Sequence, residues 1–207
     1  MMVRTGARIA CALLLLVTGC SRHGDAEPET APVNEGAPKA VGQPFTLAWK
    51  AIGGTGPEDR KLTITVTKFA CGDQITAYLV RGTAKYQEAF GRQPDAKVDA
   101  GHTPCAAILK VTNKGKKKAY FSPMVTAVDA GGVEYYQDDG LTELVSFDVN
   151  RHHRERFGGN TVGLDPRKTA TTATAYEIPA GRKITRLRYV IEEAVDSAPV
   201  TALIEVG

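Results

Sequence analysis

The sequence predicts an all-β sandwich, and three observations lead to this prediction. From residue 44 onward, short segments recur in which apolar and polar residues alternate, as in half-buried strands. Combinations of Gly, Pro, Asn and Asp that form turns separate these segments. No segment carries a convincing long helical pattern. Eight or nine short strands of this kind bury their apolar faces by packing one sheet against another.

The clearest strands lie in the first half of this region. Residues 45–50 and 62–67 alternate between large apolar side chains and small or polar ones, and the second segment continues to Cys71 before Gly72 ends it. Residues 106–112 (AAILKVT) are mostly apolar, which is typical of a central strand covered on both faces. Three strands are therefore expected here.

Residues 74–103 between these strands are ambiguous. Residues 75–80 fit a strand, whereas residues 83–90 contain enough helix formers for two helical turns. Glycine and proline recur from residue 91 to residue 104 and predict a loop.

The second half continues with short strands. Pro123 predicts a sheet edge or a bulge, because proline has no N–H to donate. Residues 141–147 are ambiguous, and residues 150–160 form a polar loop rich in Arg and His. Strands are expected at residues 119–128, 133–136, 171–178, 186–191 and 200–206.

The first 20 residues predict export. Arg4 and Arg8 precede an apolar run at residues 9–17, which is too short to span a bilayer, and the run ends in Val17-Thr18-Gly19-Cys20. This pattern resembles the bacterial lipoprotein signal, whose cysteine is acylated and becomes the first mature residue. The resemblance implies cleavage of residues 1–19, a lipid anchor at Cys20 and a location on the extracytoplasmic face of the cell membrane.

The segment after Cys20 is expected to be a tether. Residues 20–43 contain three prolines and almost no large apolar side chain, a composition typical of disorder. A flexible chain of this length reaches on the order of 25 Å. The folded domain then spans residues 44–207.

Charge excludes one class of partner. Cleavage of the signal removes Arg4 and Arg8, which leaves 24 of the 26 basic residues against 23 acidic ones, a net charge of +1. A nearly neutral chain lacks the electrostatic footprint of a nucleic-acid-binding protein.

Two cysteines remain after the signal and the anchor are set aside. Cys71 and Cys105 form an even pair in an exported chain, where oxidation is allowed. A disulfide between them would close a loop of about 35 residues and contribute roughly 3–4 kcal/mol. The alternative is two buried, inert thiols.

The spacing of several motifs resembles a known family. The motifs are Cys71-Gly72, Cys105–Gly115 (CAAILKVTNKG), Phe121–Pro123, Gly132–Tyr135, Asp165–Lys168 and Tyr176–Pro179. Over residues 44–207 the chain resembles the immunoglobulin-like domain of unknown function of actinobacterial-type lipoproteins, which is similar in architecture to a small secreted mycobacterial antigen. The resemblance implies an immunoglobulin-like two-sheet antiparallel sandwich and no catalytic residues. Arg167 occupies a position where the family pattern has glycine.

Three histidines are the candidate metal ligands. His102, His152 and His153 suit copper or zinc, but adjacent histidines project in different directions and the arginines around them repel a cation. A solvated loop is the favoured interpretation, and no cofactor is expected. Asp138-Asp139-Gly140 lacks the register of a calcium loop, so it is expected to form a turn.

A cluster of basic residues allows two interpretations. Lys114 and Lys116–Lys118, together with Arg182 and Lys183, could face an anionic wall polymer or lipid headgroups. The favoured alternative is that these charges stand at hairpin ends and prevent strand pairing between molecules.

The sequence contains no catalytic motif, so the protein is not expected to be an enzyme. The leading hypothesis is a membrane-anchored binding module with a surface protein or cell-wall partner, contacted around Tyr135, Tyr136 or the 74–103 loop. The alternative is a metal or small-ligand carrier, which requires His102 to converge with His152 or His153. A hydrolase would need a nucleophile beside a histidine, and nothing in the sequence favours it.

Overall fold

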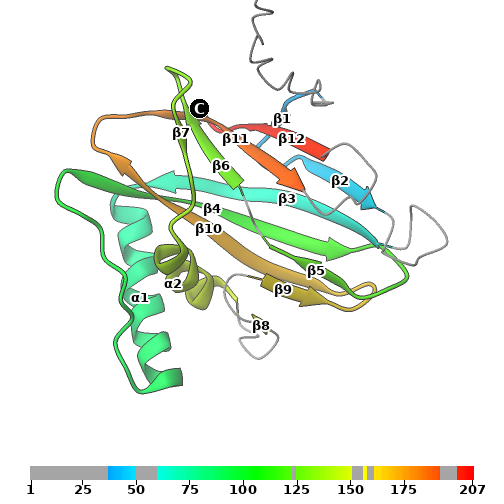
Figure 1. Cartoon of the computed structure of the whole chain (residues 1–207), viewed down its shortest axis with the longest axis horizontal. Coiled ribbons are helices and arrows are strands. Elements are labelled where there is room, and N and C mark those ends of the chain that lie inside the picture. The colour runs from blue at the N-terminus through cyan, green and yellow to red at the C-terminus, as the bar shows by residue number, and fades with distance from the viewer. Residues whose placement is uncertain (1–36, 50–59, 123–124, 151–155, 158–160, 192–199) are drawn as a thin grey trace, which may run out of the picture. The chain divides into compact units, whose positions relative to one another are not determined.

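The computed structural model describes residues 37–49, 60–122, 125–150, 156–157, 161–191 and 200–207 (Figure 1). All of them belong to one compact unit that spans residues 32–207. The predicted signal, Cys20 and most of the predicted tether lie outside the described residues. Two residues of the predicted tether range, Lys39–Ala40, form strand β1 and join the fold.

The strands form three hydrogen-bonded sheets (Figure 1). The four-stranded sheet has the order β10 (Thr169–Pro179), β4 (His102–Asn113), β3 (Arg60–Cys71) and β2 (Pro44–Trp49). The five-stranded sheet has the order β1, β12 (Val200–Glu205), β11 (Ile184–Ile191), β6 (Val125–Asp129) and β7 (Glu134–Tyr135). The three-stranded sheet has the order β5 (Ala119–Phe121), β9 (Thr161–Leu164) and β8 (Arg156–Phe157). Every pairing is antiparallel except the short β1–β12 pair.

The main core lies between the four-stranded sheet and the other two, so the chain is a β-sandwich as predicted. The alternating residues Leu62, Ile64 and Val66 of β3 are fully buried in it. On the other side of this core, Tyr189 of the five-stranded sheet stacks on Phe121 of the three-stranded sheet, with ring centroids 5.7 Å apart. The alternation in the sequence therefore reflects which side chains of a strand face the core.

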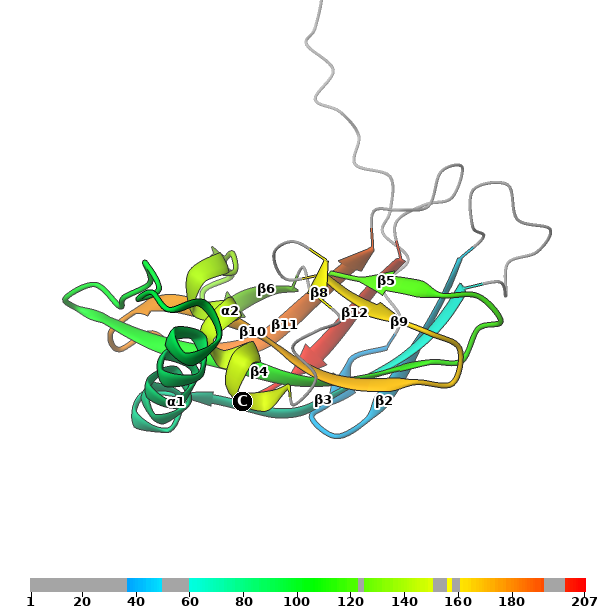
Figure 2. The same cartoon turned by 90° about the horizontal axis from the view of Figure 1, so that it is seen from below.

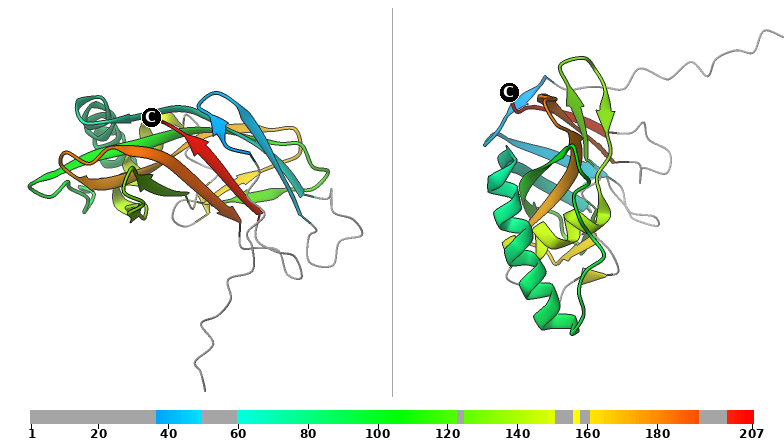
Figure 3. Two further views of the ribbon diagram at one scale, coloured as in Figure 1. Left: turned by 90° about the horizontal axis from the view of Figure 1, so that it is seen from above. Right: turned by 90° about the vertical axis from the view of Figure 1, so that its left-hand side faces the viewer.

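The outer face of the four-stranded sheet is covered by two helices, α1 (Asp73–Phe90) and α2 (Asp139–Val149) (Figures 2 and 3). A second buried cluster forms beneath them from Ile75, Ala106, Ile108, Leu141, Val145, Ala173 and Ala175. Strand β4 thus has apolar neighbours on both faces, which confirms the prediction made from its continuous apolar run.

The helices correct two expectations. Residues 75–80 are not a strand but part of α1, an 18-residue helix. Residues 83–90, which fit two helical turns, form its second half. The ambiguous residues 141–147 belong to α2, whose N-terminus is capped by the Asp138 carboxylate accepting from the Leu141 N–H at 2.7 Å. Pro123 lies outside the described residues. Within the described residues no helix is both long and apolar enough to cross a membrane.

Candidate functional site

The two helices approach each other closely at Gly82. A Cβ atom placed on Gly82 would lie 2.0 Å from the backbone oxygen of Leu144, a distance that no side chain tolerates. Glycine at this position therefore lets the backbones of α1 and α2 pack directly against each other.

Helix α2 is bonded in turn to the edge of the four-stranded sheet. The Thr142 hydroxyl donates to the Ala175 carbonyl and accepts from the Ala175 N–H at 2.8 Å. One helical turn later, the Ser146 hydroxyl makes the same pair of bonds with Ala173. The two hydroxyls take the place of a neighbouring strand, so the edge of β10 is protected from pairing with another chain.

An ion cluster fixes the far end of the helix pair. Asp148 accepts from Lys85 and from Arg81, each at 2.7 Å, while its own side chain is only 7% exposed. Burial favours the neutral carboxyl, but the bonds from Arg81 and Lys85 outweigh this effect and lower the pKa of Asp148 below its ordinary value.

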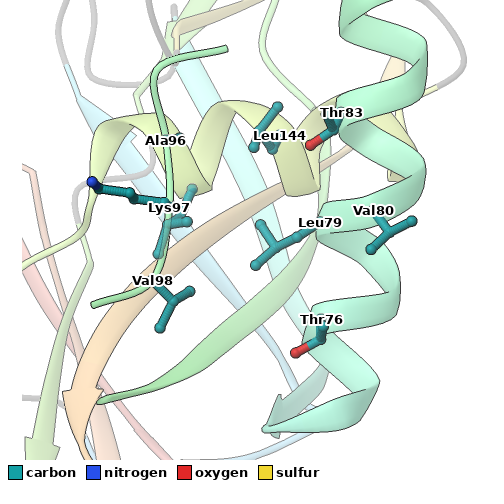
Figure 4. A pocket seen from close by; sticks show the side chains of 9 residues that line it. Thr76, Leu79, Val80, Thr83, Ala96, Lys97, Val98 and Leu144 are labelled. Carbon is teal, nitrogen blue, oxygen red and sulfur yellow. The ribbon is translucent and has the colours of Figure 1, made fainter. Parts of the chain in front are cut away.

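An apolar groove lies between α1, the loop at residues 91–101 and α2 (Figure 4). Its volume is about 280 Å³, close to the lower end of the range for small-molecule pockets. The lining residues are Thr76, Leu79, Val80, Thr83, Ala96, Lys97, Val98, Leu141 and Leu144. We call this set the helix groove.

One face of α1 forms a wall of the helix groove. Thr76, Leu79, Val80 and Thr83 have the i, i+3, i+4, i+7 spacing that places side chains on a single helix face. Val80 is 66% exposed although it is apolar. The Thr83 hydroxyl points towards the groove (Figure 4), whereas the other hydroxyl of this wall, that of Thr76, donates to the Gly72 carbonyl at 3.3 Å. This arrangement suits a small, mostly apolar ligand with one polar group.

The two cysteines are joined by a disulfide bond at the base of α1. Cys71 ends β3 and lies directly opposite Cys105 of β4, with the Cα atoms 4.0 Å apart. The bond joins the two ends of the excursion that contains α1 and the 91–101 loop, so it holds the start of α1 at the sheet.

The three candidate histidines, of which the structure describes only His102, form no metal site within the described part of the chain. His102 Nδ1 lies 3.8 Å from a Glu177 oxygen. His152 and His153 fall outside the described residues. No group of three or more His, Cys, Asp or Glu side chains suited to a metal occurs among the residues that the structure describes.

The tyrosine pair is not a continuous patch. The Tyr135 hydroxyl donates to Asp129 at 3.2 Å, whereas Tyr136 is 75% exposed. The Val133 N–H bond, which is the largest influence, and the bonds from Tyr135 and Gly131 lower the pKa of Asp129 despite its burial.

The structure separates the basic residues noted in the sequence into two groups, and Arg167 and Lys168 join one of them. Arg182 lies beside Asp129, 3.5 Å away, beyond the Pro179 end of β10. At the opposite end of that strand, the turn at residues 165–168 makes two backbone bonds to Asn113, the last residue of β4, which directly precedes the turn at residues 114–118. We call these two segments the basic turns. The register of β4 against β10, with Thr169 opposite Thr112, brings them together, a pairing that inspection of separate motifs did not reveal.

No family model matches the chain, and no curated protein matches it. Similar solved structures include an uncharacterized β-sandwich protein from Clostridium difficile 630, with 12% identity, a TM-score of 0.44, and coverage of 87% of this chain and 100% of that one. The secreted protein MPT63 of Mycobacterium tuberculosis has 12% identity, a TM-score of 0.43, and coverage of 82% and 98%. A conserved hypothetical protein from Bacillus anthracis has 16% identity, a TM-score of 0.41, and coverage of 73% and 88%. These scores are low, so the sandwich assignment depends on the sheets described above.

Proposed function

We propose that this chain is an exported protein, anchored by lipid at Cys20, whose β-sandwich binds a small apolar ligand in the helix groove. The observation that carries the proposal is the groove itself, an apolar hollow of about 280 Å³ whose walls come from three separate segments.

Two features support export and anchoring. The basic tip, the apolar run at residues 9–17 and the cysteine after Val17-Thr18-Gly19 have the order of a lipoprotein signal. The Cys71–Cys105 disulfide suits an oxidising compartment outside the cytoplasm. A cysteine that carries two or more acyl chains would hold the chain firmly, because a single acyl chain binds a membrane only marginally.

Rigid walls support ligand binding at the groove. Gly82 packs on Leu144, Asp148 bonds to Arg81 and Lys85, and the disulfide fixes the start of α1. A preformed pocket loses less conformational entropy on binding than one that must first be ordered. The groove is therefore expected to keep its shape when no ligand is bound.

A neutral fluorescent probe tests the groove. Binding of 1-aminoanthracene, and its displacement by 1-decanol, is measured for the wild type and for two variants. Val80→Asp places a charge in the wall and is expected to weaken probe binding at least tenfold. Val133→Asp changes another exposed valine, in the β6–β7 turn, and is the matched control. Equal affinities of the wild type and Val80→Asp would contradict the proposal, as would equal losses in both variants.

Intact mass tests the anchor separately. Protein from the native membrane is expected to have the mass of a chain that starts at Cys20 and carries acyl groups, and Cys20→Ala is expected to abolish that species. A full-length, unmodified chain would contradict the anchor without affecting the groove assay.

A further inference from the structure

The basic turns concentrate positive charge at one end of the sandwich. Two turns that lie more than 45 residues apart in the sequence meet there, at the end of the sheet opposite the helices, and each connects the four-stranded sheet with the three-stranded one (Figures 1 and 2). Their exposed cations are Lys114, Lys116, Lys117, Lys118, Arg167 and Lys168. The same two segments contain one acid, Asp165, which lies 3.7 Å from Lys118.

The backbone of the basic turns is held by a buried side chain. The Asn113 amide donates to the carbonyls of Lys117 and Leu164, each at 2.8 Å, and its oxygen accepts from the Gly115 N–H at 2.8 Å. Asn113 is completely buried. Because both turns are fixed to the same side chain, the backbone positions that carry the cations are held together without any ligand present.

An aromatic side chain adjoins these cations. Tyr120 follows the first turn in β5, is 39% exposed, and lies with its ring 6.0 Å from the Lys118 ammonium. Across the strand pair, Gly163 leaves room for this arrangement, since a Cβ there would meet Tyr120 and Lys118 carbons at 3.3 and 3.1 Å. An exposed tyrosine beside lysines is typical of protein surfaces at the headgroup level of a bilayer.

From this geometry we infer that the basic turns dock the sandwich onto a membrane surface rich in anionic phospholipids. The cations attract the headgroup phosphates, and the Tyr120 ring enters the interface beside them. This surface is distinct from the helix groove. The inference rests on the proposed anchor in one respect only, since a tether from Cys20 to the start of β1 at Lys39 would keep the domain within reach of a bilayer.

The positive charge of the basic turns makes membrane binding depend on the number of cations and on the salt concentration. Near an anionic surface each Lys or Arg strengthens binding about fivefold, and salt screens the attraction over about 8 Å at physiological ionic strength. Reversal of one lysine therefore acts as the loss of about two cations. The contact of the Tyr120 ring with the membrane depends little on salt, so the contributions of the cations and of Tyr120 to binding can be separated.

Vesicle sedimentation of a Cys20→Ser chain of residues 20–207 tests the inference without a lipid anchor. This chain keeps the whole compact unit and every described element. Vesicles containing one-third phosphatidylglycerol in phosphatidylcholine are compared with pure phosphatidylcholine at 50, 100 and 200 mM salt. We expect binding to the anionic vesicles, weakening with salt, and at least tenfold weaker binding to the neutral ones.

Matched variants locate the surface. Lys116→Glu is expected to weaken binding about tenfold or more and to reduce its salt dependence, while Lys183→Glu, an exposed lysine beyond the other end of β10, changes it less than threefold. Tyr120→Ala is expected to weaken binding by a similar factor at every salt concentration.

Three outcomes would overturn the inference. They are absence of binding to anionic vesicles at 50 mM salt, equal losses in Lys116→Glu and Lys183→Glu, and binding to soluble polyphosphate in preference to vesicles. The last outcome would assign the basic turns to a polyanion instead of a membrane. Because the chain carries no acyl group, failure of the proposed anchor leaves these results unchanged, and the mass measurement reports that failure separately.

Discussion

Gly82 lies against the backbone oxygen of Leu144 with no space for a side chain between them, and this contact sets the distance between α1 and α2. Both helices line the helix groove, so the same contact sets the width of the groove. A glycine inside an exposed helix normally costs stability, about 1 kcal/mol relative to alanine. Its presence in the middle of α1 is explained by the packing rather than by helix propensity.

Gly82→Ala is accordingly expected to destabilise the protein by about 1–3 kcal/mol, despite the better helix propensity of alanine, because the added methyl overpacks the helix contact. Urea unfolding followed by circular dichroism measures the change. Ala77→Gly, at an exposed position of the same helix, is the control and is expected to cost about 1 kcal/mol from propensity alone. A Gly82→Ala protein as stable as the wild type would show that the helices separate without cost.

The sheets were predictable because their burial pattern is local. Alternation at residues 62–67 and the apolar run at residues 106–112 report directly which faces are covered. The first half of helix α1 was missed because residues 75–80 (ITAYLV) are rich in strand-forming types, whereas residues 83–90 were found to fit two helical turns. Its buried face also includes Gly82, which packs closely without contributing an apolar side chain to the pattern.

The candidate sites depend on contacts between distant segments. The helix groove combines Val80, Val98 and Leu141, which no local pattern relates. The basic turns combine Lys114–Lys118 with Arg167 and Lys168 through the pairing of β4 with β10. Antiparallel pairing of the two predicted strands at residues 106–112 and 171–178 was the signal that could have revealed the second site.

The hydroxyls of α2 provide a second test of the fold. Thr142→Val keeps the shape of the side chain but leaves the Ala175 N–H without its 2.8 Å acceptor. Loss of a buried partner of this kind costs about 1–3 kcal/mol, and urea unfolding is expected to show it. Thr126→Val, on the partly exposed face of β6, is expected to change stability by less than about 0.5 kcal/mol. Equal effects of the two substitutions would argue against the role of Thr142 as a strand substitute.

Asp148 predicts how stability depends on pH. Its pKa is lower in the folded chain than in the unfolded chain, so between the two values the unfolded state binds more protons. Its contribution is therefore complete above the unfolded value, near 4, and is lost as the pH falls through the folded pKa. We expect the free energy of unfolding to fall on acidification below about pH 4–5.

Two variants identify the groups responsible for this pH dependence. Asp148→Asn is expected to be less stable than the wild type at pH 7 and to lose less stability on acidification. Asp129, whose pKa is also lowered, accounts for part of the remaining slope. Asp165→Asn, at an exposed position, is the control and is expected to reproduce the wild-type curve. Identical curves for Asp148→Asn and the wild type would exclude the ion cluster as a source of the acid sensitivity.

Arg167 adopts a backbone conformation that favours glycine, with φ at +67°. Non-glycine residues pay roughly 1–2 kcal/mol there, whereas glycine adds about 0.5–1 kcal/mol of entropy to the unfolded chain. Arg167→Gly is therefore expected to stabilise the protein by up to about 1 kcal/mol in urea unfolding. The change keeps the backbone bond from the residue 167 N–H to the Asn113 carbonyl at 2.8 Å. Lys168→Gly, at the next position, lacks a positive φ and is expected to be neutral or destabilising. If both substitutions destabilised the protein equally, the strain at Arg167 would be insignificant and the arginine side chain would itself support the turn.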